Sequence, residues 1–194
     1  GGGSPYYSSV LLGGKWWAPV NVGASYVGTD NSNDSHTGRF FQWGRKNGIT
    51  INNGYTYKSS GAPVSVSQDL VNTFYKCNWG TYDWVTPQDN NLWKPNSNTA
   101  NNPCPAGYYV ASRDDWNALS SRSRTSANGR VTLPSDNNID LILPQAGNLD
   151  SDNSRGGKNS SATYWTSTPT GNSCYKFISY SNKWIVDSSI RGNA

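Results

Sequence analysis

Residues 101–119 read NNPCPAGYYVASRDDWNAL and carry the clearest local structural signal in the chain. Ser112 precedes RDDWNAL, and Asp115 follows it by three positions. This spacing is an aspartate version of the capping box, in which each of the two side chains accepts a hydrogen bond from the other residue's backbone N–H. We therefore predict a short amphipathic helix after Ser112, with Trp116 and Leu119 turned inward.

Outside this helix the composition favours strands and turns. All 12 acidic residues are Asp, and the chain is rich in Asn, Ser, Gly, Trp and Tyr but poor in good helix formers. Residues 15–22 (KWWAPVNV) and 39–44 (RFFQWG) alternate apolar and polar side chains, which predicts two strands. Residues 67–75 (SQDLVNTFY) place apolar side chains on one helical face and are a weaker helix prediction. The expected fold class is α+β, with small helices packed on antiparallel strands.

A long segment rich in Pro, Asn and Trp, residues 78–105, predicts an ordered loop held in place by buried indoles. The alternative is that these Trp side chains only fill a core that is poor in aliphatic residues. The residues expected to be structural are Trp43, Trp84, Cys104, Trp116 and Trp165.

Residues 28–37 (GTDNSNDSHT) superficially resemble a calcium-binding loop. The spacing of an EF-hand fails at its end, because no Glu exists in the chain to supply the bidentate ligand. We predict an ordinary turn rich in Asx hydrogen bonds and no metal site. His36 is the one histidine, and no GxSxG motif is present, so we expect no catalytic residues of the serine-hydrolase kind.

Charge and hydropathy exclude several classes of partner. The net charge is +4, but the 16 Lys and Arg residues are scattered rather than gathered in the dense stripe of a nucleic-acid interface. No stretch approaches the roughly 20 apolar residues that span a membrane. Charged residues make up 14% of the chain, well below the roughly one quarter usual for soluble domains, and this favours an exported protein at the cell surface or outside the cell. No signal peptide is recognisable in the chain.

The distribution of aromatic residues predicts one domain. Trp and Tyr are spread along the whole chain, as one shared core would require, and we assign residues 5–194 to it. Gly1–Ser4 is interpreted as a linker remnant. Three cysteines, Cys77, Cys104 and Cys174, allow one disulfide and leave one thiol over, without the spacing of a zinc site.

The C-terminal segment, residues 164–194, resembles a recognition surface in composition. Tyr and Trp provide rigid contact area, while Ser, Asn and Gly provide adaptable hydrogen bonds. Alternate residues of a strand point to opposite sides, so Tyr175, Phe177 and Ser179 form one set and Lys176, Ile178 and Tyr180 form the other. Because Ile178 has the character of a core residue, we expect the first set to point outward. A turn over residues 181–183 would then leave Trp184, Val186 and Ser188 together, although a one-residue slip would exchange the faces.

Six motifs occur in order: WWAPVNVG, FFQWGRKNG, YDWVTPQDNNLW, NNPCPAGYYVASRDDWNAL, LPQAG and YWTSTP. Together they resemble the major paralogous domain named from Fibrobacter, a family abundant in surface proteins of Bacteroidota-like bacteria. The resemblance runs from about residue 16 to 191 and implies a C-type lectin-like fold, related to that of formylglycine-generating enzymes. Family members usually continue with a short final strand containing a Cys. The resemblance implies either that Cys104 pairs with that Cys or that Cys77 pairs with Cys104 and leaves Cys174 as a surface thiol; a strand from another chain could also take that place.

A similar fold and a YWSST-type motif occur in variable proteins of diversity-generating retroelements, whose adenine-directed mutagenesis randomises codons near the C-terminus. Residues reachable from an AAC codon are common in this segment, although Lys176, Lys183 and Trp184 are not reachable and any strand rich in Ser and Tyr would fit the same broad set. The resemblance and the composition predict a ligand-binding surface made of the following residues: Cys174, Tyr175, Phe177, Ser179, Tyr180, Trp184, Val186, Asp187, Ser188 and Ser189.

These observations predict an extracellular, adhesin-like ligand-binding domain rather than an enzyme, without a cofactor. Its partner would be a protein or glycan receptor on another cell, and its setting a pilus tip, a cell surface or a phage. The alternative is a structural or carbohydrate-binding module that is not diversified, although the EPN, QPD and WND triplets of calcium-dependent lectins are missing. A formylglycine-generating oxidase is a weaker alternative, because no paired catalytic cysteine motif is evident.

Overall fold

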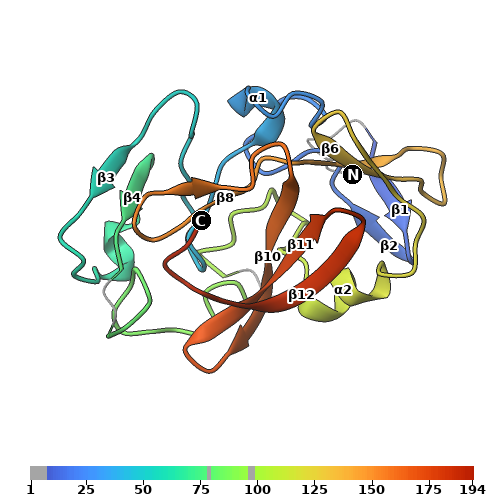
Figure 1. The fold of residues 1–194 in the computed structure, drawn as a ribbon. Helices are drawn as coiled ribbons and strands as arrows, with labels where there is room; N and C mark the ends of the chain where they lie inside the picture. The colour runs from blue at the N-terminus through green and yellow to red at the C-terminus, as the bar shows by residue number, and fades with distance from the viewer. Residues whose placement is uncertain (1–7, 78–79, 96–98) are drawn as a thin grey trace.

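The computed structural model describes residues 8–77, 80–95 and 99–194 (Figure 1). Within these residues the fold is α+β and rich in strands, with small sheets and short helices. The helical elements are α1 (Asp34–Thr37), a 3-10 turn η1 (Val66–Gln68) and α2 (Arg113–Ala118). The strands are β1 (Val10–Leu12), β2 (Lys15–Trp17), β3 (Thr56–Lys58), β4 (Thr73–Tyr75), β5 (Thr125–Ala127), β6 (Arg130–Leu133), β7 (Leu141–Pro144), β8 (Asn148–Leu149), β9 (Arg155–Gly156), β10 (Ser161–Thr170), β11 (Ser173–Tyr180) and β12 (Lys183–Ile190).

The predicted helix after Ser112 is confirmed as α2. The Ser112 hydroxyl accepts from the backbone N–H of Asp115 at 3.1 Å, and the Asp115 carboxylate accepts from the backbone N–H of Ser112 at 2.8 Å. Trp116 and Leu119 are both buried. Because the two cap hydrogen bonds are local, the sequence spacing alone was enough to predict this helix.

Of the two strands predicted near the N-terminus, the first is shorter than expected and the second is wrong. The first, residues 15–22, ends at Trp17, where β2 finishes its antiparallel pairing with β1 ahead of Pro19. The second, residues 39–44, is not a strand and forms only an isolated bridge between Phe40 and Ile49. The buried Gln42 side chain instead donates to the carbonyls of Tyr75 and Gly192, so a side chain joins this segment to its neighbours in place of a backbone ladder.

The helix predicted over residues 67–75 is wrong. The chain makes one 3-10 turn at η1 and then enters β4, which pairs in parallel with β3. Asn72 has a φ of 51°, a left-handed conformation that interrupts any right-handed helix. Leu70 and Val71, expected on a buried helical face, are exposed, whereas Phe74 is fully buried in the strand.

The Asx-rich turn predicted over residues 28–37 is confirmed. The Asp30 carboxylate accepts from the N–H of Ser32 at 2.9 Å, and the Asn33 side chain caps the short helix α1, which was not predicted. Asp34 is buried and accepts from the backbone N–H groups of Asn52 and Asn53. Its carboxylate therefore fixes a neighbouring loop.

The described parts of the predicted loop, residues 80–95 and 99–105, contain no helix or named strand, and buried indoles hold them in place as expected. Trp84 Nε1 donates to the Trp43 carbonyl at 2.7 Å, and Trp93 Nε1 donates to the Arg45 carbonyl at 3.1 Å. Trp79, the third Trp of this loop, lies outside the described residues.

A three-stranded antiparallel sheet of β10, β11 and β12, here called the C-terminal sheet, crosses the molecule with α2 against one side (Figure 1). Ser181 and Asn182 join β11 to β12 with φ angles of 45° and 63°, which is the pattern of a two-residue type I′ hairpin turn. At the far end of β12, the buried Arg191 side chain donates to the carbonyls of Gly171 and Ser173 and lies 4.7 Å from the Trp43 ring centroid. Both ends of the hairpin are thereby fixed.

Candidate functional site

The side of the C-terminal sheet that faces α2 is part of the core. Phe177 and Ser179 have no exposed surface, and the Trp116 ring stacks on Phe177 with centroids 4.4 Å apart. The prediction that Tyr175, Phe177 and Ser179 point outward is therefore wrong for Phe177 and Ser179. The strand alternates as expected, but the larger Phe ring rather than Ile178 takes the core side because Trp116 supplies an aromatic partner there.

Tyr175 and Ser188 lie at the edge of this covered side. They are cross-strand partners, and Tyr175 is half-buried beneath the Arg113 guanidinium, 4.3 Å from its ring centroid. Ser188 is exposed. Arg113, the first residue of α2, is thus the helix residue that covers Tyr175, while both Tyr175 and Ser188 retain contact with solvent.

Trp184 and Val186 share a side, as predicted, but that side also packs against the core. Both are half-buried against the cluster that contains Phe177, and Trp184 Nε1 donates to the Trp116 carbonyl at 3.0 Å. The Arg124 guanidinium lies 5.1 Å from the Trp184 ring centroid on the outside. Trp184 therefore holds β12 against α2, which is a structural role that its position in a polar segment did not indicate.

All three cysteines have free thiols. Cys174 is fully buried in a cluster with Trp43 and Trp84, which contradicts the alternative that leaves it as a surface thiol, and Cys77 and Cys104 are not paired. Burial raises the pKa of Cys104 and that of Cys174 to about 12 each, so the reactive thiolate is strongly disfavoured at neutral pH at both positions. Cys77 is also buried, and burial raises its pKa.

The other side of the C-terminal sheet presents a row of side chains to solvent near the hairpin turn. Ile178 pairs with Ile185 and Tyr180 pairs with Lys183, and the next residue of the row on β12 is Asp187. Tyr180, Lys183 and Asp187 are exposed, and the Lys183 amine lies 5.5 Å from the Tyr180 ring centroid. We call these five residues the open face. Of the predicted ligand-binding residues only Tyr180 and Asp187 belong to it, because the two sides had been exchanged.

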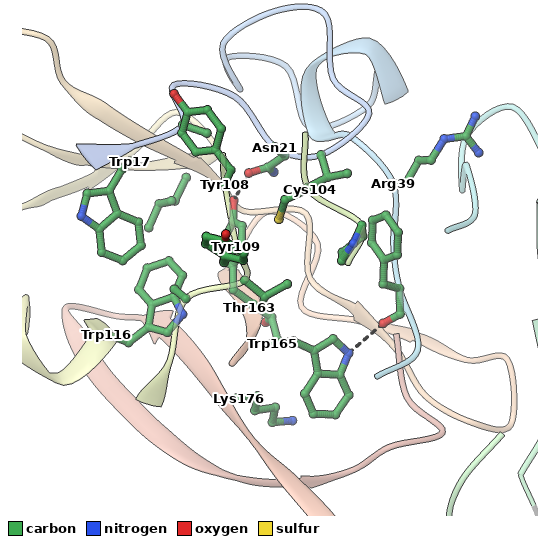
Figure 2. A pocket seen from close by; sticks show the side chains of 18 of the residues that line it. Trp17, Asn21, Arg39, Cys104, Tyr108, Tyr109, Trp116, Thr163, Trp165 and Lys176 are labelled. Atoms are coloured by element: carbon green, nitrogen blue, oxygen red, sulfur yellow. Dashed lines mark hydrogen bonds between the residues drawn. The ribbon is translucent and has the colours of Figure 1, made fainter. Parts of the chain in front are cut away.

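The remaining predicted residue, Ser189, is half-buried and lines a cavity beside the C-terminal sheet. This cavity has a volume of about 440 Å³ (Figure 2). Both β7 and β10 contribute to its wall, and each is the outermost strand of its sheet. Trp165, expected to be structural, is half-buried in this wall and donates from Nε1 to the Phe41 carbonyl at 2.7 Å.

The cavity wall is mainly aromatic and apolar. Figure 2 shows Tyr109 near the middle of the lining residues, with Trp17 on one side and Trp165 and Cys104 on the other. Tyr109 and Trp16, at 41% and 62% exposed, form part of the rim, so the cavity reaches the surface. A cavity of this size and character is typical of sites for small molecules.

Lys176 is the cross-strand neighbour of Trp165 and also lines the cavity. Desolvation by burial lowers the pKa of the Lys176 amine, although Asp150 and Asp187 act in the opposite direction. Lys176 was not among the predicted site residues, because its position opposite Trp165 depends on strand pairing that the sequence does not reveal.

Among the described residues no group of three or more His, Cys, Asp or Glu side chains is placed to hold a metal ion. In the same part of the chain, no helix is both long and apolar enough to cross a bilayer. Comparisons of the chain with family models, curated proteins and solved structures find no match.

Proposed function

We propose that this protein is an extracellular, adhesin-like ligand-binding domain with a C-type lectin-like fold, and that it contacts its partner through the open face. The observation that carries this proposal is the division of one hairpin into two sides. One side is fixed by the stacked rings of Phe177 and Trp116, while the other exposes Tyr180, Lys183 and Asp187. Binding groups placed on a rigid framework lose little conformational entropy when a partner binds.

The chemistry of the open face suits a protein or glycan receptor on another cell. Tyr180 offers a flat ring with a hydroxyl, Ile178 and Ile185 offer apolar contact, and Lys183 and Asp187 offer opposite charges. Tyrosine is among the commonest residues that dominate binding energy at protein interfaces, and an aromatic ring can also stack on a sugar. No cofactor is needed for either mode of binding.

Diversification by a retroelement could change only some of the predicted ligand-binding residues without disturbing the fold. Substitution at Tyr180, Asp187 or Ser188 changes exposed side chains, whereas substitution at Cys174 or Phe177 changes the core. We propose that variation among related copies is concentrated at the exposed positions. The setting would be a cell surface, a pilus tip or a phage.

The first test is to sequence the encoding locus across isolates and to score each codon between residues 164 and 194. We expect replacements that derive from adenine changes at Tyr180, Asp187 and Ser188, with Phe177 unchanged. A segment that does not vary, or variation spread equally over buried and exposed codons, would contradict diversification. A fixed adhesin or a structural module would then be the remaining interpretation.

Contact through the open face is tested by measuring how the purified domain binds to a panel of immobilised glycans and to intact cells. Where binding is detected, Tyr180→Ala should weaken it by about 1 kcal/mol or more. Tyr26→Ala is a matched control, because Tyr26 is 61% exposed and lies outside the C-terminal sheet. Equal loss with both variants would argue against a contact through the open face.

A further inference from the structure

The outer edge of β12 presents backbone groups that no other described strand pairs with. β12 is the last strand of the C-terminal sheet, next to β11 (Figure 1). In an antiparallel pair, residues that exchange hydrogen bonds with the neighbouring strand alternate with residues whose backbone groups point away from it. The two-residue turn makes Tyr180 and Lys183 a hydrogen-bonded pair. The backbone groups of Trp184, Val186 and Ser188 therefore point to the outer edge.

The free part of this edge is short and has defined ends. The backbone N–H and C=O groups of Trp184 and Val186 have no hydrogen-bond partner among the described residues. At one end, the Asn182 carbonyl accepts from the Arg124 guanidinium at 2.7 Å. At the other end, the Ser188 N–H donates to the carboxylate of the residue before it at 2.7 Å. A run of unpaired backbone groups between two satisfied ones is a template for another strand.

The opposite edge of the same sheet is interrupted, whereas the β12 edge is regular. On β10, the pairing becomes irregular between Trp165 and Pro169, and Pro169 has no N–H to donate. Proline and irregular pairing are features that protect edge strands from pairing with other chains. β12 contains no proline and pairs with β11 over all eight residues without a shift of register. The β12 edge therefore lacks the protection that β10 has.

The free edge is complementary to itself in sequence. It reads KWIVD from Lys183 to Asp187, so two opposite charges stand at equal distances on either side of Ile185. If two copies of β12 pair antiparallel about Ile185, Lys183 of each copy lies directly opposite Asp187 of the other. Trp184 of each copy then lies opposite Val186 of the other, and each such pair exchanges backbone hydrogen bonds. This pairing uses the backbone groups that are free in one copy.

The two charges at this edge form no ion pair within the part of the chain that the structure describes. Lys183 lies beside the Tyr180 ring, and Asp187 faces Lys176 across the hairpin without an ion pair. Opposite charges directly across from each other on neighbouring strands stabilise a sheet, whereas like charges destabilise it. A second copy would bring an opposite charge to each of them.

The alternative antiparallel register, centred one residue later, fits less well. It would place Lys183 opposite an uncharged side chain, that of Ser189. It would also need the Ser188 N–H, which already donates to Asp187. The hydrogen bonds and the charges at the edge therefore favour the same register, centred on Ile185.

We propose that this protein forms a weak symmetric dimer in which the β12 edges of two copies pair antiparallel about Ile185. The two three-stranded sheets would then form one continuous sheet. Ile178 and Ile185 of both copies would form one apolar row across it. The two-fold axis of such a pair is perpendicular to the sheet, so both open faces lie on the same side. Dimerisation does not depend on the receptor proposed above, although it would present the open face twice.

Sedimentation velocity in reducing buffer measures the dimerisation constant. Because one strand edge makes a small interface, the protein is studied from about 5 to 500 µM, where we expect its mass to rise towards that of a dimer. Lys183→Asp and Asp187→Lys each place like charges at both ends of the pair, and each should weaken dimerisation about tenfold or more. Lys58→Asp and Asp140→Lys are matched controls, because these exposed residues lie outside the C-terminal sheet.

A mixture of the two single variants gives a sharper test. One variant carries two acidic side chains at these positions and the other carries two basic ones, so a mixed pair has opposite charges at both contacts. An equimolar mixture of Lys183→Asp and Asp187→Lys should therefore dimerise under conditions where neither variant does so alone. The double variant with both replacements should regain self-association. Circular dichroism confirms that each variant is folded.

Amide hydrogen exchange followed by NMR locates the contact. The amides of Trp184 and Val186 should exchange rapidly in dilute protein and become protected as the concentration rises. The amides of Ile185 and Asp187 point towards β11 and should be protected at every concentration.

Four results would overturn the proposal. They are a monomer at every concentration, charge reversals at the edge that weaken dimerisation no more than the controls do, an equimolar mixture that stays monomeric, and protection of Trp184 and Val186 in the dilute monomer. The last result would show that another segment of the same chain already covers this edge.

Discussion

The two sides of the β11–β12 hairpin are made from alternate residues of the same strands, yet they have different environments. Towards α2, Phe177 and Ser179 are completely buried, and Trp184 packs against them. On the opposite side, Tyr180 and Asp187 face solvent. The residue types on the two sides overlap, since each contains aromatic, aliphatic and polar members. The difference therefore comes from what covers each side, and it decides which positions can change without loss of the fold.

The largest expected effect is loss of the aromatic contact beneath α2. Phe177→Ala should lower the free energy of unfolding by about 3–5 kcal/mol, because a stacked, fully buried ring is removed and a cavity is left. The matched variant Ile178→Ala changes the next residue on the open face and should cost clearly less. Urea denaturation measures both, and equal costs would mean that the two sides are not distinct.

Cys174 lies on the same side of β11 as the open face but further from the turn, and there it is fully buried. Alkaline pH tests whether this thiol is shielded from water. The thiols of Cys104 and Cys174 have an ordinary pKa near 9 when the chain is unfolded, and burial raises it to about 12 in the fold. A raised pKa gives stability that is present below pH 9 and is lost as pH rises towards 12, because only the unfolded thiols ionise in that range. We expect the free energy of unfolding to fall by about 1 kcal/mol or more for each thiol between pH 8 and pH 10.

Urea denaturation at pH 7, 8, 9 and 10 measures this slope. Cys174→Ala should make the slope shallower, whereas a variant with the same slope as the unchanged protein would show that this thiol is not desolvated. Buried tyrosines act in the same direction at higher pH, because burial also raises the pKa of Tyr164.

Two serine replacements test whether a buried and an exposed position of the hairpin tolerate a larger side chain. Ser179→Tyr places a ring in the packed side and should destabilise the protein by about 1–3 kcal/mol. Ser188→Tyr places the same ring at an exposed position of β12 and should change the free energy of unfolding by less than about 0.5 kcal/mol. Thermal melts of both variants decide between a surface that tolerates replacement and one that does not.

The smallest expected effect concerns the helix that covers the packed side. Ser112→Ala removes the N-cap hydrogen bond to Asp115 and should cost about 1 kcal/mol. Ser120→Ala lies just beyond the other end of α2, is exposed and should have little effect. If the two variants melt at the same temperature, the cap does not contribute to holding α2 against the sheet.

The elements that could be predicted from the sequence are those that depend on neighbours in the chain. The α2 cap and the Asx turn at Asp30 are made by hydrogen bonds over two or three residues, so their spacing is visible in the sequence. The helix predicted over residues 67–75 failed because amphipathic spacing does not reveal the left-handed conformation of Asn72 or the pairing of β4 with β3. Tertiary context decided that segment.

The candidate site was predictable only in part for the same reason. Tyr180, Asp187 and Ser188 were expected at the surface and are exposed, but the orientation of Phe177 depends on Trp116, which lies on a separate helix. The cavity could not be foreseen, because its wall combines residues from β2, β7, β10 and the loop around Cys104. No pattern within one segment contains that information.

The turn at Ser181 and Asn182 carries a consequence for how this surface can evolve. Its two left-handed residues set the pairing of β11 with β12 for all eight residue pairs, and the Asn182 carbonyl is further held by the Arg124 guanidinium. Inserting or deleting a single residue in either strand would shift that pairing and bring core side chains to the outside. Side chains on the exposed positions can therefore be exchanged while the strand lengths stay constant, whereas a change in the number of strand residues would disrupt the packing of the hairpin.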